Sequence, residues 1–264
     1  MDNASKINEL IKRNEVDYIK IFSDTFENHN IIRFRDREVR DIRFYNSTHI
    51  KDSLDSGKIK AIIDEEMELG YKDKVEFCRF TIDDRLPGEE VLKVCRRKYD
   101  VEYYGNYVYG SREYPSWKVN DQCEVRRVVN QHMIDEYFSL DMNMGDELNN
   151  SDLCERRAKR EGRAILSDAP ADMYICYENK IPVAYCEIFF GKAIAKLENL
   201  CVLPECRKRG IATTMLKHLV DIALKNKAKT IYLVADEEDT VKEMYKNLGF
   251  IKTGESYAVV YDLK

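Results

Sequence analysis

Leu200-Cys201-Val202-Leu203-Pro204-Glu205-Cys206-Arg207-Lys208-Arg209-Gly210-Ile211-Ala212 is the stretch of the sequence that decides the fold. An apolar strand runs into a proline, a basic loop with one glycine follows, and an amphipathic helix begins directly after it. The first amides of a helix lack partners within the helix, and the helix dipole favours negative charge at that end. The loop therefore predicts a phosphate-binding turn, to which three basic side chains add positive charge and in which Gly210 allows close approach of the backbone.

The residues after this loop predict a helix, a strand, a second helix and a closing strand. In the first helix, apolar side chains recur at helical spacing, which predicts one face packed on a sheet: Ala212, Met215, Leu216, Leu219, Ile222 and Ala223. The range 230–234 is rich in β-branched and aromatic residues, which is typical of a strand. Thr240 to Glu243 has the pattern of a capping box at the start of the second helix. Gly249 predicts the end of that helix, and Phe250 begins the next strand.

Two signatures in this half resemble those of the GNAT family (GCN5-related N-acetyltransferases). The first is Arg-x-x-Gly-x-Ala at residues 207–212, with Val-x-Pro directly before it. The second is Tyr245, followed four residues later by Gly249-Phe250. Two signatures in the right order and at the right separation are far more specific than either alone. The resemblance therefore implies the GNAT fold for the second half, a mixed, twisted sheet flanked by helices.

The chain of 264 residues is long enough for two domains. The pattern breaks around 114–117, which contain the only tryptophan, and starts again at Cys123. We therefore expect one domain over 1–118 and a second, catalytic domain over 119–264. Before the basic loop, the second domain is predicted to contain a strand, two helices and three further strands: 123–128, 130–142, 150–161, 173–177, 181–190 and 193–202.

The first half shows, less clearly, the same order of helices and strands with which the second half ends. A helix is predicted at 58–69, a strand at 75–82, a helix at 89–97 and two tyrosine-rich strands within 101–109. This half contains neither the Arg-x-x-Gly-x-Ala pattern nor a tyrosine before Gly-Phe. The expected fold is therefore α/β with a mixed sheet, in which a smaller, degenerate GNAT-like half precedes a GNAT acyl-CoA N-acyltransferase domain. This arrangement is similar to that of tandem-GNAT proteins, and we expect only the second half to bind acyl-CoA.

Composition excludes several classes of protein. With 44% hydrophobic and 34% charged residues the chain is globular, and no apolar run approaches the ~20 residues that a membrane-spanning helix needs. The polar start lacks the apolar core of a signal peptide, so we expect a cytoplasmic protein without a membrane partner. The net charge of −5 argues against nucleic acid as a partner. The eight cysteines and four histidines are scattered without metal-ligand spacing, which predicts buried free thiols and no metal site.

The resemblance implies transfer of an acetyl group from acetyl-CoA to a primary amine, by direct attack in a ternary complex, with a small molecule as the expected acceptor. The backbone of the strand before the loop would bind the pantetheine arm, at positions matching Cys201, Val202 and Leu203. Since that role needs backbone groups, Cys201 is not expected to act as a nucleophile. The pyrophosphate would bind the loop at Arg207, Lys208, Arg209, Gly210, Ile211, Ala212 and Thr213.

Two proton transfers need side chains. An amine with a pKa near ~10 is protonated at neutral pH, so a base must remove its proton. Glu198 is the candidate, and on an unbroken strand it shares a face with Leu200 and Val202. The alternatives are that Glu198 is a solvent-facing charge at a strand edge, that Lys196 occupies the functional position, or that water removes the proton. Tyr245 matches the family tyrosine that protonates the leaving thiolate, although it also fits a core position.

Two other functions remain open from the sequence. One is a CoA-binding sensor or scaffold module with little catalysis, and the other is an acetyltransferase that acts on a protein or peptide. The tyrosines of the first half either line an acceptor pocket between the halves or pack as strand residues: Tyr99, Tyr103, Tyr104, Tyr107 and Tyr109. We expect the loops of 140–172 and the interface between the halves to select the acceptor.

Overall fold

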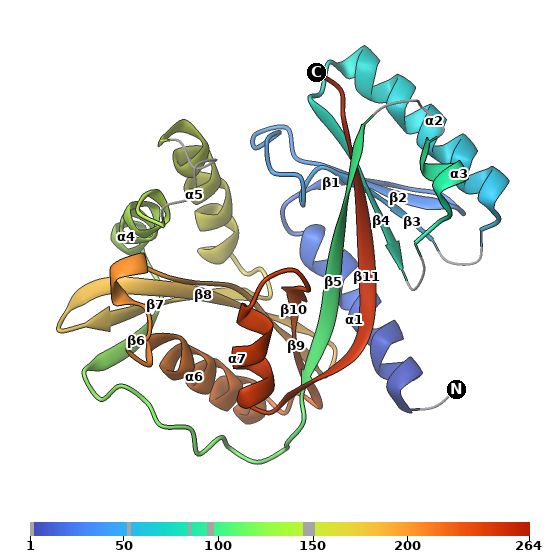
Figure 1. The fold of residues 1–264 in the computed structure, drawn as a ribbon. Helices are drawn as coiled ribbons and strands as arrows, with labels where there is room; N and C mark the ends of the chain where they lie inside the picture. Colours follow the sequence, from blue (N-terminus) through green and yellow to red (C-terminus); the bar gives the residue numbers. More distant parts are fainter. Residues whose placement is uncertain (1–2, 52–53, 84–85, 94–97, 145–150) are drawn as a thin grey trace.

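A single sheet runs through both halves of the protein. The computed structural model describes residues 3–51, 54–83, 86–93, 98–144 and 151–264. Over these residues, eleven strands form one sheet in the order β1-β2-β3-β4-β11-β5-β10-β9-β8-β7-β6 (Figure 1). The long strands β5 and β11 lie at its centre and connect the two halves.

The first half contributes three helices and five strands of this described part: α1 (Asn3–Ile19), β1 (Asp24–Glu27), β2 (Ile31–Arg35), β3 (Ser47–Ile50), α2 (Ser56–Asp73), β4 (Phe77–Asp83), α3 (Glu89–Leu92) and β5 (Tyr99–Tyr109). The second half contributes the rest: β6 (Cys123–Arg127), α4 (Gln131–Met142), α5 (Ser151–Ile165), β7 (Ala171–Glu178), β8 (Ile181–Gly191), β9 (Ile194–Val202), the 3₁₀ turn Pro204–Cys206, α6 (Ile211–Lys225), β10 (Thr230–Asp236), α7 (Val241–Asn247) and β11 (Phe250–Asp262).

The two halves repeat one pattern and exchange their last strands. In each, three antiparallel strands are followed by a helix and a strand parallel to the third: β1 to β3, α2 and β4, then β7 to β9, α6 and β10. The final strand of each half pairs with the other half, β5 with β10 and β11 with β4. β5 and β11 also pair with each other. Between β5, which ends at Tyr109, and β6, which begins at Cys123, the chain thus passes from one structural repeat to the next within a single sheet.

Helices cover the second half of the sheet on both faces. On one face, α6 packs against β8 and β9 through the apolar face that the sequence predicts, with Met215, Leu219 and Ala223 fully buried. On the other face, α4 and α5 pack together with the end of α1, where Tyr18 and Tyr137 are buried. Because both faces are covered, β8 is buried almost throughout, which explains its nearly continuous apolar sequence.

Several local predictions need correction. Residues 99–109 form one strand, β5, and not two. The predicted capping box at Thr240 is wrong, because Thr240 makes no side-chain cap and the Asp239 carboxylate accepts from the Val241 amide instead (3.0 Å). Gly249 ends α7 with φ +85°, as predicted. Of the helix predicted at 89–97, residues 94–97 lie outside the described residues.

Helix α1 has no counterpart in the sequence prediction. It contacts β8, β9 and β11, so it joins the two halves (Figure 1). Within the described residues, no helix has both the length and the apolar character that a membrane span requires. The seven cysteines of this part of the chain are free thiols.

Candidate active site

The parallel strands β9 and β10 pair over only three residues and then separate. Their register runs from Ile194 opposite Thr230 to Lys196 opposite Tyr232. Both strands continue, β9 to Val202 and β10 to Asp236, without further pairing between them. The β10-facing backbone edge of β9 therefore lacks a strand partner from residue 197 onward, which leaves an opening in the sheet.

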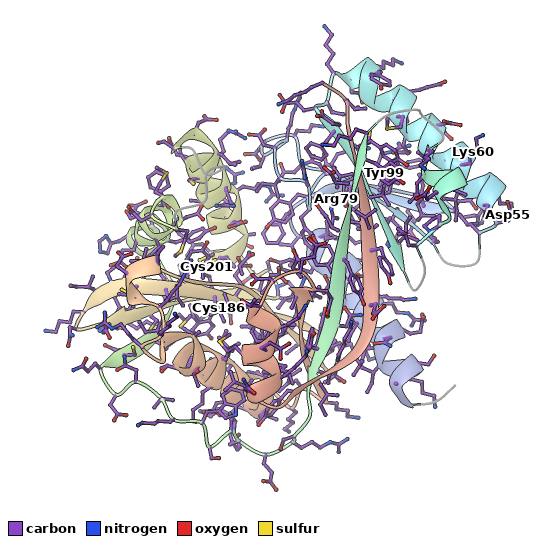
Figure 2. The ribbon with its side chains drawn as sticks, in the orientation of Figure 1. Asp55, Lys60, Arg79, Tyr99, Cys186 and Cys201 are labelled. Carbon is purple, nitrogen blue, oxygen red and sulfur yellow. The ribbon has the colours of Figure 1, made fainter. Side chains whose placement is uncertain are left out.

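A β-bulge explains this separation. Tyr185 pairs with Cys201 and Glu187 with Glu198, so the single residue Cys186 lies opposite the two residues between them on β9. Asn199, in the bulge, has φ +53°, and the Cys186 thiol donates to the Glu198 carbonyl (3.2 Å). A bulge bends its strand and increases the local twist, and here it turns β9 away from β10. Figure 2 labels Cys186 and Cys201 on the two paired strands.

The bulge also changes which face each residue of β9 occupies. On an unbroken strand Glu198 would share a face with Leu200 and Val202, as we expected. Leu200 and Val202 instead pack with the α6 side of the sheet, and Glu198 lines a cavity on the α1 side. The extra residue reverses the alternation, so the expected shared face is wrong.

The basic loop presents free backbone donors at the start of α6. Gly210 precedes the helix with φ +79°, a backbone conformation that glycine adopts without strain. The amides of Ile211, Ala212 and Thr213 have no hydrogen-bond partner among the described residues, whereas Thr214 donates to the Gly210 carbonyl (3.0 Å). Three unpaired donors at the positive end of a 15-residue helix can bind an anion.

The three basic side chains of the loop differ in the partners that they contact. Arg209 forms an ion pair with Glu178 (2.6 Å), so its charge is already balanced. Arg207 Nε donates to the Val202 carbonyl (3.2 Å). Lys208 is exposed and has no partner within the described part of the chain. Asn120 holds the loop in place by donating to the Arg209 carbonyl (3.0 Å), a contact that no sequence motif indicates.

A cavity of about 330 Å³ lies between the two halves, on the α1 side of the sheet. The first half supplies walls from α1 and from β2 to β5, and the second supplies walls from α4, α5 and β8 to β11. Aromatic rings form much of its lining: Tyr18, Phe34, Phe44, Tyr45, Tyr104, Tyr137, Tyr185 and Tyr257. The cavity thus depends on both halves of the chain.

Glu198 lines this cavity beside a buried lysine. Lys196 Nζ lies 2.7 Å from Glu198 Oε2 and 2.7 Å from Glu15 Oε2. Burial raises the pKa of Glu198 above its ordinary value, against the lowering effect of Lys196. The pKa of Lys196 is also raised, because the two carboxylates outweigh the effect of burial. The Glu198 side chain is thus 23% exposed and lies within the cavity, with Lys196 as its charged partner.

A second carboxyl group lies directly across the strand pair. Glu187 pairs in register with Glu198 and is fully buried, accepting hydrogen bonds from Tyr18 Oη (3.0 Å) and Asn199 Nδ2 (2.8 Å). Burial, together with the charge of Glu161, raises the pKa of Glu187 to about 8. Glu187 therefore holds a proton near neutral pH. A charged residue within an apolar strand was the sequence signal that could have identified it.

Tyr245 lies on the other side of the sheet opening. It is on α7, 8% exposed, and its hydroxyl has no hydrogen-bond partner among the described residues. Burial raises the pKa of Tyr245, and its ring packs in the α6-side core that also contains Cys186 and Leu200, beside the bulge. The structure therefore places the two predicted catalytic groups around one opening, Glu198 on the cavity side and Tyr245 on the α6 side.

Of the five tyrosines of β5 considered above, Tyr104 lines the cavity. Tyr103 stacks on Tyr257, with ring centroids 5.0 Å apart, and Tyr107 donates to Glu237 (2.8 Å). The cavity residues that sequence reasoning missed come mainly from elements that carry no motif: Glu15, Arg79, Arg157, Glu161 and Asn199. Within the described residues, no group of His, Cys, Asp and Glu side chains could hold a metal ion.

Comparisons with known proteins agree with this architecture. The family model of the Acetyltransferase (GNAT) family matches residues 133–250. An uncharacterized N-acetyltransferase of Bacillus subtilis (strain 168), CgeE, is 27% identical over 85 residues, which are 30% of this chain and 33% of the relative. The match thus spans about a third of that relative's length.

Solved structures share the fold over most of the chain. A functionally unknown conserved protein from Staphylococcus epidermidis superposes with a TM-score of 0.75 at 16% identity, over 92% of this chain and 95% of the other. A tandem GNAT protein from the clavulanic acid biosynthesis pathway superposes with a TM-score of 0.60 at 11% identity, over 88% of this chain and 77% of the other. The two-half architecture is therefore the fold that the tandem GNAT protein also has, and residues 133–250 of this chain match the model of the Acetyltransferase (GNAT) family.

Proposed function

We propose that the protein is an acetyl-CoA-dependent N-acetyltransferase that modifies a primary amine of a small molecule, by direct attack in a ternary complex. One observation carries this proposal. The opening between β9 and β10 joins two sites, an amide-rich turn at the start of α6 and a cavity that contains Glu198. Such an opening lets a cofactor on one side of the sheet meet an acceptor on the other.

The residues present fit acetyl-CoA. The free amides of Ile211, Ala212 and Thr213 suit a pyrophosphate, with Gly210 leaving room for it and Arg207 and Lys208 adding charge. The β10-facing edge at the end of β9, at Cys201 and Val202, has no strand partner and suits the amide-containing arm, with Leu203 directly after it. Arg209 would support the turn through Glu178 instead of neutralising the ligand. When bound, acetyl-CoA supplies an acetyl group activated as a thioester.

Glu198 is the proposed base. It accepts the proton that an ammonium group must lose before it can attack, and its raised pKa makes it a stronger base than an ordinary carboxylate. Lys196, at 2.7 Å, favours the ionised form of Glu198 and offsets part of the penalty of burial. The proton-holding Glu187 opposite it prevents a second negative charge from accumulating there.

Tyr245 is the proposed acid. Its raised pKa keeps the phenol protonated throughout the neutral range, so that it can give its proton to a leaving sulfur. The absence of a competing hydrogen bond among the described residues leaves the hydroxyl available for that contact. Acid and base then act on opposite sides of the same opening.

The proposed domain roles follow from the cavity. Residues 119–264 carry both catalytic candidates and the phosphate-binding turn, whereas 1–118 supplies much of the acceptor cavity. A volume of about 330 Å³ lies at the lower end of the range for small-molecule sites, roughly 300–1,000 Å³. A cavity of this size suits a metabolite better than a folded protein.

Calorimetry with acetyl-CoA, and with CoA and ATP as comparisons, tests the first part of the proposal. We expect micromolar binding of acetyl-CoA, followed by amine-dependent release of free thiol from it. Binding without thiol release across primary amines would instead indicate a CoA-binding module. No binding would refute the assignment of the turn.

A further inference from the structure

The wall of the cavity contains a buried guanidinium with an unsatisfied donor. Arg79, on β4, is 4% exposed, and its Nε donates to Glu102 Oε2 (2.9 Å). Its Nη1 is buried and has no hydrogen-bond partner among the described residues. Figure 2 shows Arg79 beside β5. Since a buried donor without a partner is costly, such an atom indicates a group that the bound state supplies.

The charges around Arg79 favour an anion as that group. Glu102 is shared by three groups, because it also accepts from Tyr104 Oη (2.9 Å) and lies 3.8 Å from Arg43 Nη1. Two guanidinium groups thus face one carboxylate, which leaves a net positive charge. Arg43 is half exposed and does not line the cavity. Arg79 also pairs with Glu102, but it forms part of the cavity wall.

A single aromatic ring connects this guanidinium to the proposed base. The centroid of Phe44 lies 5.7 Å from Arg79 Cζ and 5.2 Å from Lys196 Nζ. Lys196 in turn contacts Glu198 at 2.7 Å. The positive group and the base therefore lie at two ends of one short cavity, which a single small molecule can span.

We infer that the acceptor is an amino carboxylate, whose amine lies at Glu198 and whose carboxylate binds Arg79. This inference rests on the proposed N-acetyltransferase function and specifies its substrate class. A guanidinium favours a carboxylate because it can donate two parallel hydrogen bonds to the two oxygens. The aromatic lining between the two ends then packs against the carbon chain of the acceptor.

Matched pairs of acceptors test the inference. Thiol release from acetyl-CoA is measured with lysine and cadaverine, ornithine and putrescine, and tyrosine and tyramine, each pair differing only by the carboxylate. We expect at least one acid to exceed its decarboxylated amine by tenfold or more in kcat/KM, the change that one hydrogen bond to a charged group produces. The methyl ester of that acid should lose the advantage.

Variants assign the preference to one residue. Arg79→Gln should remove the advantage of the acid while retaining turnover of the amine, and Arg79→Lys should restore part of it. Arg43→Gln is the matched control, because it contacts the same Glu102 from outside the cavity and should leave the preference intact. Thermal unfolding of each variant checks that it is folded.

The outcomes separate the two proposals. Failure to bind acetyl-CoA refutes the function itself. If acetyl-CoA binds and amines react without any preference for the acid, only the substrate class is overturned. The same holds if Arg79→Lys and Arg79→Gln both keep the wild-type preference. If acetyl-CoA binds but no member of any pair releases thiol, the N-acetyltransferase function is refuted together with the substrate class.

Discussion

Gly210→Glu is the most direct test of the phosphate-binding turn. A Cβ at this position would have its nearest neighbours, the Asn120 Cβ and amide, at 3.8 and 3.9 Å, so a side chain fits without steric conflict. The added carboxylate would stand next to the free amides of Ile211 to Thr213 and compete with a pyrophosphate for them. The substitution therefore acts mainly on the anion site.

The size of the effect follows from the contacts that are lost. Charge-assisted hydrogen bonds contribute about 1.5–3 kcal/mol each. Loss of two of the three amide contacts would weaken acetyl-CoA binding by about 3–6 kcal/mol, which is ~150-fold or more. The φ of +79° adds a separate cost, since a residue with a Cβ in this region loses about 1–2 kcal/mol of folding stability.

Gly210→Ala is the matched control, because it imposes the same backbone strain without the charge. Both variants should lower Tm by a few degrees. Calorimetry should show near wild-type affinity for acetyl-CoA in Gly210→Ala and loss of binding in Gly210→Glu. Equal affinities in the two variants would refute the assignment of the turn.

Three further predictions concern catalysis and folding. Tyr245→Phe should bind acetyl-CoA normally but lower kcat by ~10²-fold or more, and an unchanged rate would remove Tyr245 from the mechanism. Glu198→Gln should lower kcat/KM by ~10²–10⁴ and remove the acidic limb of the pH profile. Since the pKa of Glu198 is raised, wild-type activity should fall as pH drops through a value above the ordinary carboxyl range. Glu15→Gln, which also breaks a contact of Lys196, is the control and should keep this acidic limb. Loss of the acidic limb in Glu15→Gln would implicate the ion pair of Lys196 instead of Glu198 itself. Residues 119–264 produced alone should aggregate, because β10 and β11 lose β5 between them; a soluble, acetyl-CoA-binding fragment would contradict this.

Sequence periodicity predicted the elements of the second half closely, because α6 and the strands beside it have strong amphipathic or apolar patterns. The first half was predicted less well. Helix α1 and the short strands β1 to β3 escaped notice, since short strands and a weakly patterned helix give little signal. The two tyrosine-rich strands expected before Gly110 are one long strand, whose length follows from pairing with both β10 and β11.

The sequence by itself determined the local chemistry of this protein. The basic loop with Gly210, the helix after it, and Tyr245 before Gly249 are all encoded by neighbouring residues, whose backbone preferences and spacing can be read directly. Tertiary structure alone decided what these groups face. The bulge at Asn199 turns Glu198 into the cavity, and the exchange of β5 and β11 brings Arg79 within one aromatic ring of Lys196. The position of Glu198 and the position of Arg79 both depend on strand pairing between distant segments, which no local pattern specifies.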